Sequence, residues 1–164
     1  MNPDDLKIGV TAEAFVITAV GRANFEYAVP IRDLVNKNEG HKTIRVDLQQ
    51  CLAMDSTFMG VLSMAGLKAA DNGSSVEIYN ASEVLKKSLY DLGVDELFVY
   101  KEGSPGIAVR YIASSEADML TKAETVVEAH QKLVEADDAN AERFDDVIRY
   151  AGQDVERLKK QDRS

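Results

Sequence analysis

The residues best suited to chemistry are Asp55, Ser56 and Thr57, which lie together between a β-type segment and an apolar segment with helical spacing. Small polar side chains at the start of a helix accept hydrogen bonds from its free backbone N–H groups, so these residues are suited to capping. The same position is the positive end of the helix dipole, where one phosphoryl group has a large local effect. The junction is therefore interpreted as either an ordinary helix cap or a phosphorylation switch.

The rest of the chain offers little for catalysis. Its two histidines, His41 and His130, fall on an expected loop and on a terminal helix, and no HExxH, GxSxG, GxGxxG or Walker motif occurs. The one cysteine, Cys51, excludes an internal disulfide and a zinc ribbon, and it is interpreted as a buried, inert thiol. Acidic pairs near the C-terminus are interpreted as solvated helix faces. We therefore expect no enzyme active site, no metal site and no cofactor.

Composition narrows the class of protein. The 164 residues suit one ordinary domain or a smaller domain with an appendage, and a hydrophobic share of 45% is enough for a core. The formal net charge of 19 − 28 = −9 disfavours nucleic acid and anionic membranes as partners. The N-terminus lacks signal-peptide regions, and the longest apolar stretch, residues 14–20, is too short to span a bilayer. We expect a cytoplasmic protein without membrane insertion.

The elements that must position the junction follow from hydrophobic spacing. Expected strands occupy residues 6–10, 14–21, 43–48, 75–79 and 97–100, and expected helices begin at Asn24, near Ser56 and after residues 80–82. The apolar face of the third helix is expected to consist of Val84, Leu85, Leu89 and Leu92. Residues 107–112 alternate like an edge strand. The order ββαβαβαβ predicts an α/β fold: an opening hairpin within a mixed, mainly parallel sheet with right-handed crossovers.

A strand, the sequence Met54-Asp55-Ser56-Thr57, an apolar helix containing Gly60, and a further strand and helix together resemble the STAS domain. That family includes bacterial anti-sigma factor antagonists. The resemblance covers about residues 6–100, including the Leu92-Gly93 turn before the last strand. It implies a STAS-like fold in which Ser56 matches the serine that a partner kinase phosphorylates. Asp55 and Thr57 match the residues that flank this serine, and Thr57 is the alternative acceptor.

The resemblance also implies a function: a phosphoprotein that switches partners in bacterial signal transduction. The expected protein partners are an anti-sigma factor or a related serine kinase-like regulator. The expected partner-binding residues are Met54, Asp55, Ser56, Thr57, Phe58 and Met59. The sequence departs from the family pattern at Phe58, where glycine is usual, and at Met59, where leucine is common. The alternative function is a STAS scaffold without kinase control, or the small subunit of a larger complex.

Residues 113–164 are predicted to form a helical extension of a STAS-like domain at residues 1–112. Apolar positions recur at spacings of three and four from Leu120 to Leu158, a heptad-like stripe that includes His130. For His130 this favours packing over ligation. The stripe is weak around Asp137, so the chain either folds back there as a helical hairpin or continues as one long coiled-coil helix. The extension is expected to form a homodimer or to cover one face of the first domain.

Overall fold

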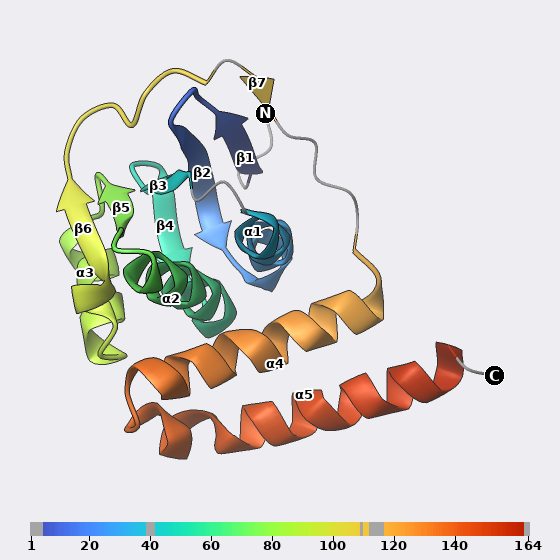
Figure 1. The fold of residues 1–164 in the computed structure, drawn as a ribbon. Helices are drawn as coiled ribbons and strands as arrows, with labels where there is room; N and C mark the ends of the chain where they lie inside the picture. The colour runs from blue at the N-terminus through green and yellow to red at the C-terminus, as the bar shows by residue number, and fades with distance from the viewer. Residues whose placement is uncertain (1–4, 39–41, 109, 112–116, 163–164) are drawn as a thin grey trace.

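The computed structural model describes residues 5–38, 42–108, 110–111 and 117–162 of the chain (Figure 1). Strands β1 to β7 cover Asp5–Val10, Ala14–Ala23, Thr43–Asp47, Cys51–Met54, Val76–Tyr79, Phe98–Lys101 and Arg110–Tyr111. Helices α1 to α5 cover Phe25–Lys37, Ser56–Asp71, Glu83–Asp91, Met119–Ala136 and Asn140–Asp162. A short 3-10 turn, Asp95–Leu97, precedes β6. None of the helices in the described ranges is long and apolar enough to cross a membrane.

One sheet organises the first part of the chain. Its strands lie in the order β6-β5-β3-β2-β1-β7, and β4 pairs with the end of β2 outside this path. Strands β2, β3, β5 and β6 are parallel, whereas β1 pairs antiparallel with β2 and with β7. The predicted mixed, mainly parallel sheet with an opening hairpin is therefore confirmed. Two predicted helix starts are confirmed as well, because Asn24 caps α1 and Ser82 caps α3.

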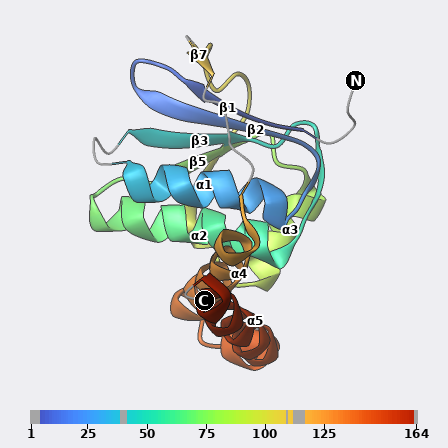
Figure 2. The ribbon, with the colours of Figure 1, turned by 90° about the vertical axis from the view of Figure 1, so that its right-hand side faces the viewer.

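The molecule is layered (Figure 2). Helices α1, α2 and α3 cover one face of the sheet, and α4 and α5 lie on the far side of these helices. The main core fills the space between the sheet and the first helix layer, where Ile17, Val46 and Ile78 of the strands meet Phe58 and Leu62 of α2. Each such buried side chain contributes about 1.5–3 kcal/mol of hydrophobic free energy.

Helix α2 is covered on two sides. Its residues from Thr57 to Gly66 are all buried, whereas a helix that packs on one side only keeps a polar face toward water. The sheet covers one side of α2, and α4 packs against the other. The middle of α2 is therefore part of two interfaces, which explains why its sequence lacks a polar face.

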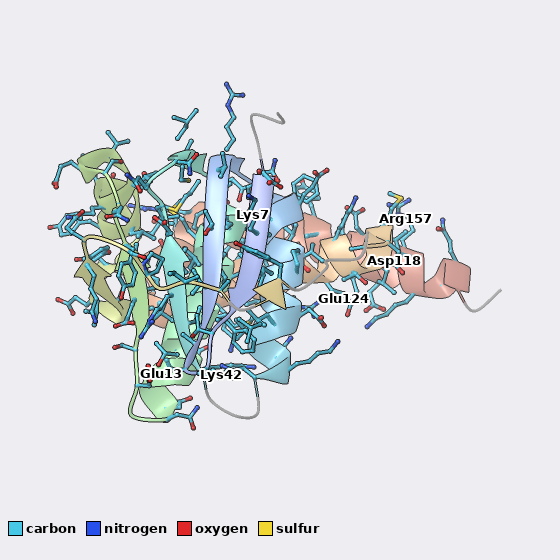
Figure 3. The ribbon with its side chains drawn as sticks, turned by 90° about the horizontal axis from the view of Figure 1, so that it is seen from above. Lys7, Glu13, Lys42, Asp118, Glu124 and Arg157 are labelled. Carbon is cyan, nitrogen blue, oxygen red and sulfur yellow. The ribbon has the colours of Figure 1, made fainter. Side chains whose placement is uncertain are left out.

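The C-terminal segment is a helical hairpin. The Asp118 carboxylate caps α4 by accepting a hydrogen bond of 2.8 Å from the Thr121 N–H, and the chain reverses between Asp137 and Asn140. The buried Asn140 amide donates hydrogen bonds of 2.8 Å to the carbonyls of Leu92 and Leu133. Of the two predicted alternatives, the chain therefore adopts the folded-back one. The open end of the hairpin, with Asp118 and Arg157, extends past α1 (Figure 3).

Some expected elements differ from the observed ones. Strand β4 was not expected, and it continues the sheet directly before the junction. Val84, expected on the apolar face of α3, is 70% exposed. The edge strand expected at residues 107–112 is limited to Arg110–Tyr111, with residues 109 and 112 outside the described part of the chain. The predicted domain boundary between residues 112 and 113 also lies outside the described residues.

Candidate functional site

The junction between β4 and α2 is held by Asp55. Its backbone is extended, and its carboxylate accepts a hydrogen bond of 2.8 Å from the Phe58 N–H. Its own N–H donates to the Ala23 carbonyl at 2.9 Å, which ties the junction to the end of β2. Such a cap stabilises a helix by about 0.5–2 kcal/mol. Asp55 is thus the cap, and Ser56 is the first helical residue with its hydroxyl free for another partner.

The partner of the Ser56 hydroxyl is His130 of α4. Ser56 Oγ lies 2.8 Å from His130 Nε2, and His130 Nδ1 lies 2.7 Å from the Val126 carbonyl oxygen. A carbonyl only accepts, so Nδ1 carries a hydrogen, and in the neutral ring Nε2 accepts the hydrogen of the Ser56 hydroxyl. The residues of this pair are 74 positions apart in the chain.

His130 is buried, with 2% of the residue exposed. Burial lowers the pKa of His130 below its usual 6.5, because desolvation disfavours the charged imidazolium; the Val126 carbonyl and the Asp55 charge act in the opposite direction. The ring also packs edge-to-face against Phe144 of α5, with 4.9 Å between centroids. His130 is therefore held as a neutral acceptor that links α2, α4 and α5.

Helices α2 and α4 approach each other closely one turn after Ser56. At Gly60, an added Cβ would overlap the backbone carbonyl and the side chain of Ala129. Glycine is required here because only a residue without a side chain lets the two backbones meet. Thr125, Ala129 and Leu133 of α4 are fully buried along the same interface. The first turns of α2 therefore lie directly beneath α4.

Polar contacts fix the hairpin to the other helices. Arg32 of α1 forms a salt bridge of 2.6 Å with Glu128 of α4, and both side chains are partly exposed. Arg143 of α5 donates to the Asp91 carbonyl at the end of α3 at 2.7 Å. The hairpin is thus attached to all three helices of the inner layer.

The predicted partner-binding residues divide into two groups. Met54, Asp55 and Ser56 are partly exposed. In contrast, Thr57 is 6% exposed, Phe58 0% and Met59 8%. In this arrangement of the chain, the last three side chains are not an exposed contact surface, and Phe58 belongs to the core. Partner binding through the junction stays a prediction.

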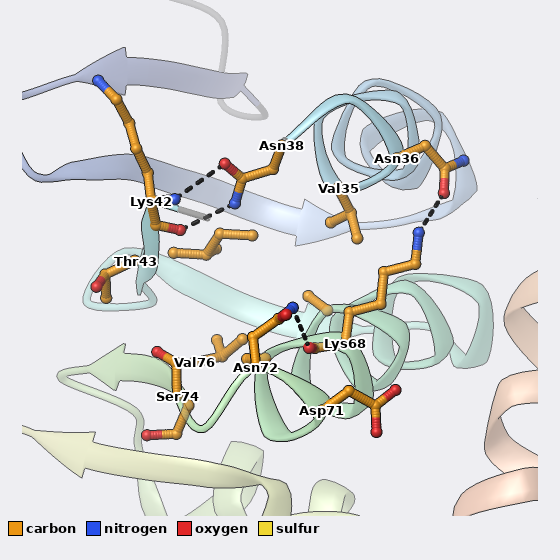
Figure 4. A pocket seen from close by; sticks show the side chains of 14 residues that line it. Val35, Asn36, Asn38, Lys42, Thr43, Lys68, Asp71, Asn72, Ser74 and Val76 are labelled. Carbon is orange, nitrogen blue, oxygen red and sulfur yellow. Dashed lines mark hydrogen bonds between the residues drawn. The ribbon is translucent and has the colours of Figure 1, made fainter. Parts of the chain in front are cut away.

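A second candidate region is a cavity of about 250 Å³ at the opposite end of α2 (Figure 4). Its walls come from the ends of α1 and α2 and the starts of β3 and β5. The Asn38 amide bonds to both backbone groups of Lys42, and Lys68 donates to Asn36 at 2.8 Å. These polar groups are engaged with one another, and the cavity does not include the junction.

Cys51, at the start of β4, is buried as predicted. Burial raises the pKa of its thiol above the usual value, and Sγ donates to the Ala53 carbonyl at 3.4 Å. This favours the unreactive thiol over the thiolate. In the described part of the chain, no three His, Cys, Asp or Glu side chains cluster as metal ligands would.

The pairing of Ser56 with His130 is a contact at the junction that the sequence did not predict. His130 was assigned to packing on the C-terminal stripe, and it does pack, against Phe144. One signal in the sequence pointed to a covering element. Residues 57–66 contain only Thr57 and Ser63 as polar side chains. A helix exposed to water on one side would carry more polar residues on that side, so this composition indicates that a second element covers α2.

Comparisons with known proteins agree with this fold. A family model described as "Mlab, STAS domain" matches residues 7–100. A search of curated proteins finds no match. A solved structure described as a putative anti-sigma factor antagonist from Thermotoga maritima is 16% identical, with a TM-score of 0.50, over 61% of this chain and 87% of that chain.

Two similar structures are of the anti-sigma factor antagonist SpoIIAA. The phosphorylated form, described as a Bacillus cell fate determinant, is 19% identical over 62% of this chain and 92% of that chain, with a TM-score of 0.50. The unphosphorylated form is 18% identical over 62% of this chain and 88% of that chain, with a TM-score of 0.49. At these identities the likeness concerns the fold alone. The α4–α5 hairpin lies beyond the residues that the family model matches.

Proposed function

Because the chain belongs to the STAS domain family, we propose that it is a phospho-regulated protein-interaction module of the anti-sigma factor antagonist type, switched at Ser56. One observation carries the proposal: Ser56 is the first residue of α2, directly after the capping Asp55. Backbone N–H groups and the helix dipole favour an anion at this position. One similar structure is described as a phosphorylated form, and this supports a phosphoryl group as that anion.

The phosphoryl group acts on a partner more than on the fold. It adds about −1.5 to −2 charges next to the Asp55 carboxylate. A partner that docks over this end of α2 must then desolvate the phosphate or pair it with arginine. Ser56 is the preferred acceptor because its side chain is partly exposed, whereas Thr57 is buried. The partner-binding surface of the proposal centres on Met54, Asp55 and Ser56.

The partners that this proposal requires are a serine kinase and a regulator of the anti-sigma factor type. The module itself performs no catalysis and acts in the cytoplasm. Modification of Ser56 changes which protein it binds.

The test is capture of partners from native lysate by the full chain with Ser56→Ala or Ser56→Asp. We expect the Ser56→Ala chain to retain a partner that the Ser56→Asp chain loses by tenfold or more. Ser104→Asp is a matched control, because Ser104 is exposed on a loop beyond β6. Equal capture by the Ser56→Ala and Ser56→Asp chains would contradict phospho-regulation.

A second function, a STAS scaffold or small subunit without kinase control, is favoured by a different observation. The Ser56 hydroxyl is engaged by a buried histidine, and the three residues that follow Ser56 are buried. For a scaffold, this arrangement is a permanent helix–helix contact. The scaffold function predicts that Ser56→Asp leaves partner affinity unchanged, so the same capture experiment separates the two functions.

A further inference from the structure

The α4–α5 hairpin covers the region on which the proposed function depends. It lies on the side of α2 that faces away from the sheet (Figures 1 and 2). Its contacts with α2 begin at Ser56, through His130, and continue at Gly60, against Ala129. The family-matched residues end at 100, so the segment that covers the junction is additional to the family fold.

We propose that the hairpin is an internal lid on the junction, with a docked and an undocked state. In the docked state His130 accepts the Ser56 hydroxyl hydrogen and α4 covers the outer side of the first turns of α2, so that Ser56 is only partly exposed. In the undocked state Ser56 and the outer face of α2 are open to a kinase and to a partner. Phosphorylation of Ser56 shifts the balance toward the undocked state. This inference rests on the proposed function, because it assumes that Ser56 is modified.

Docking and modification compete for the same oxygen. The kinase transfers the terminal phosphoryl group of a nucleoside triphosphate to Ser56 Oγ. The Oγ–P bond forms, the bond from phosphorus to the nucleoside diphosphate breaks, and the hydroxyl proton passes to a base of the kinase. In the docked state that proton is directed at His130 Nε2, 2.8 Å away, beneath α4. The hydroxyl must leave His130 before a kinase reaches it.

The modified serine disfavours redocking for two reasons. A phosphate ester oxygen carries no hydrogen, so the buried Nε2 of His130 loses its donor, and an unpaired buried polar group is unfavourable. The phosphate also places negative charge next to the Asp55 carboxylate, under a helix whose Thr125 and Ala129 are fully buried. The interface is close-packed there, so it does not readily take in a phosphoryl group.

The hairpin has the character of a separable element. The matches to this chain span 87% and 92% of the length of the two solved structures. The STAS-like fold is therefore nearly the whole of those chains, and it is complete there without a hairpin like α4–α5. In the chain described here, the hairpin contacts α2 at Gly60, against Ala129, and at Ser56, through His130. Undocking exposes an apolar face of α2, which is the kind of surface that a protein partner covers.

The test uses the full chain with phosphoserine incorporated at position 56 and amide hydrogen exchange as the readout. We expect amides of Ala129 to Leu133 in α4 to exchange at least tenfold faster than in the unmodified chain, with β3 amides unchanged. Phosphoserine at position 104, on an exposed loop, should leave α4 unchanged. Unchanged or slower exchange in α4 with phosphoserine at position 56 would overturn the lid, since the phosphate would then be accommodated beneath α4, for example by pairing with a protonated His130.

A second variant opens the lid without adding charge. Gly60→Ala places a methyl group against the Ala129 backbone, whereas Gly152→Ala in α5 meets open space and is the matched control. In a Ser56→Cys chain, we expect thiol labelling at position 56 to be at least tenfold faster with Gly60→Ala than with Gly152→Ala. Equal labelling rates would contradict the lid.

These measurements need neither the host kinase nor the partner. The lid can therefore be disproved without disproving phospho-regulation at Ser56, and the reverse is also true. If host protein carries phosphate on Ser56 but the phosphoserine chain keeps α4 docked, the lid is wrong and the proposed function stands. If phosphoserine releases α4 but host protein never carries phosphate on Ser56, the proposed function is wrong.

Discussion

The hydrogen bond between Ser56 and His130 depends on the protonation state of the imidazole. The neutral ring accepts the serine hydroxyl through Nε2 while Nδ1 donates to the Val126 carbonyl. The Ser56 hydroxyl lies against Nε2, the Phe144 ring packs edge-to-face against the imidazole, and the Asp55 carboxylate acts on the His130 pKa through its charge. Burial outweighs the Asp55 charge, so the pKa of His130 is lowered. Proton binding to His130 therefore opposes the folded arrangement in which this ring is buried.

The lowered pKa of His130 predicts a pH dependence of stability. Below about pH 6.5, the unfolded chain binds a proton at His130 more readily than the folded chain does. The free energy of unfolding should therefore decrease as pH falls from 6.5 toward the lower folded pKa, and it should be insensitive to this group above 6.5. Urea unfolding between about pH 7.5 and 5 measures this slope. His130→Gln should remove it and His41→Gln should keep it; an equal slope in both variants would contradict the assignment.

The capping role belongs to Asp55, and it predicts a selective loss of stability. Asp55→Ala removes the acceptor of the Phe58 N–H and should cost about 0.5–2 kcal/mol of unfolding free energy. Asp55→Asn keeps a side-chain oxygen and should cost much less. Chemical denaturation of both variants is the measurement, and equal losses would show that charge, and not capping, dominates at this residue.

Helix α2 shows what sequence can and cannot reveal about one element. Its position and its starting region were predictable because a β-type run, small polar residues and an apolar periodic segment follow each other locally. Its second interface was not predicted, because the contact partner is 74 residues away and no local rule links Ser56 to His130. The absence of a polar face between residues 57 and 66 was the one usable signal.

Strand β4 and helix α3 illustrate weaker local signals. The four residues of β4 carry one buried side chain, Cys51, beside the exposed Leu52, so they lack the alternation that identifies a strand. Val84 was placed on the α3 apolar face but is exposed, whereas Leu85 and Leu89 are buried, so the covered side of α3 follows the line from Leu85 to Leu89 and leaves Val84 beside it. In both places tertiary position, and not residue type, decides burial.

The close approach of α2 and α4 predicts that alanine substitutions at two glycines change the free energy of unfolding in opposite directions. Gly60→Ala introduces overlap with the Ala129 backbone, and such overpacking typically costs about 1–3 kcal/mol. Gly152→Ala is helical with open space around it, so it should stabilise the chain by up to about 1 kcal/mol through helix propensity. Thermal unfolding compares the two variants. A Gly60→Ala chain as stable as Gly152→Ala would show that α2 and α4 do not meet closely at Gly60.

At the scale of the whole molecule, the chain consists of a sheet, an inner helix layer and an outer hairpin. The sequence predicted the mixed sheet and the existence of a helical C-terminal segment. It left open whether this segment forms a hairpin and whether it covers the same chain or another copy. In the structure the α4 residues Ala129, His130 and Leu133 are buried within one chain. A homodimer through these residues would first require undocking.

The α4–α5 hairpin covers α2 of the same chain, and this predicts what happens when the hairpin is removed. Deletion of residues 115–164 exposes the outer face of α2, which is buried in the full chain. We expect stronger binding of a hydrophobic dye and a tendency to aggregate, because large exposed apolar patches promote association. Dye fluorescence and light scattering measure both. A shortened chain that stays monomeric and binds no more dye than the full chain would contradict intramolecular cover.

The proposed switch requires that a kinase phosphorylates Ser56 in the host. The most direct test is the intact mass of the full chain isolated from its own host under several growth conditions, followed by mapping of the modified residue. We expect a phosphoryl adduct on Ser56 in at least one condition and its absence from the Ser56→Ala chain. No adduct on Ser56 or Thr57 under any condition would contradict the claim and leave the scaffold function in its place.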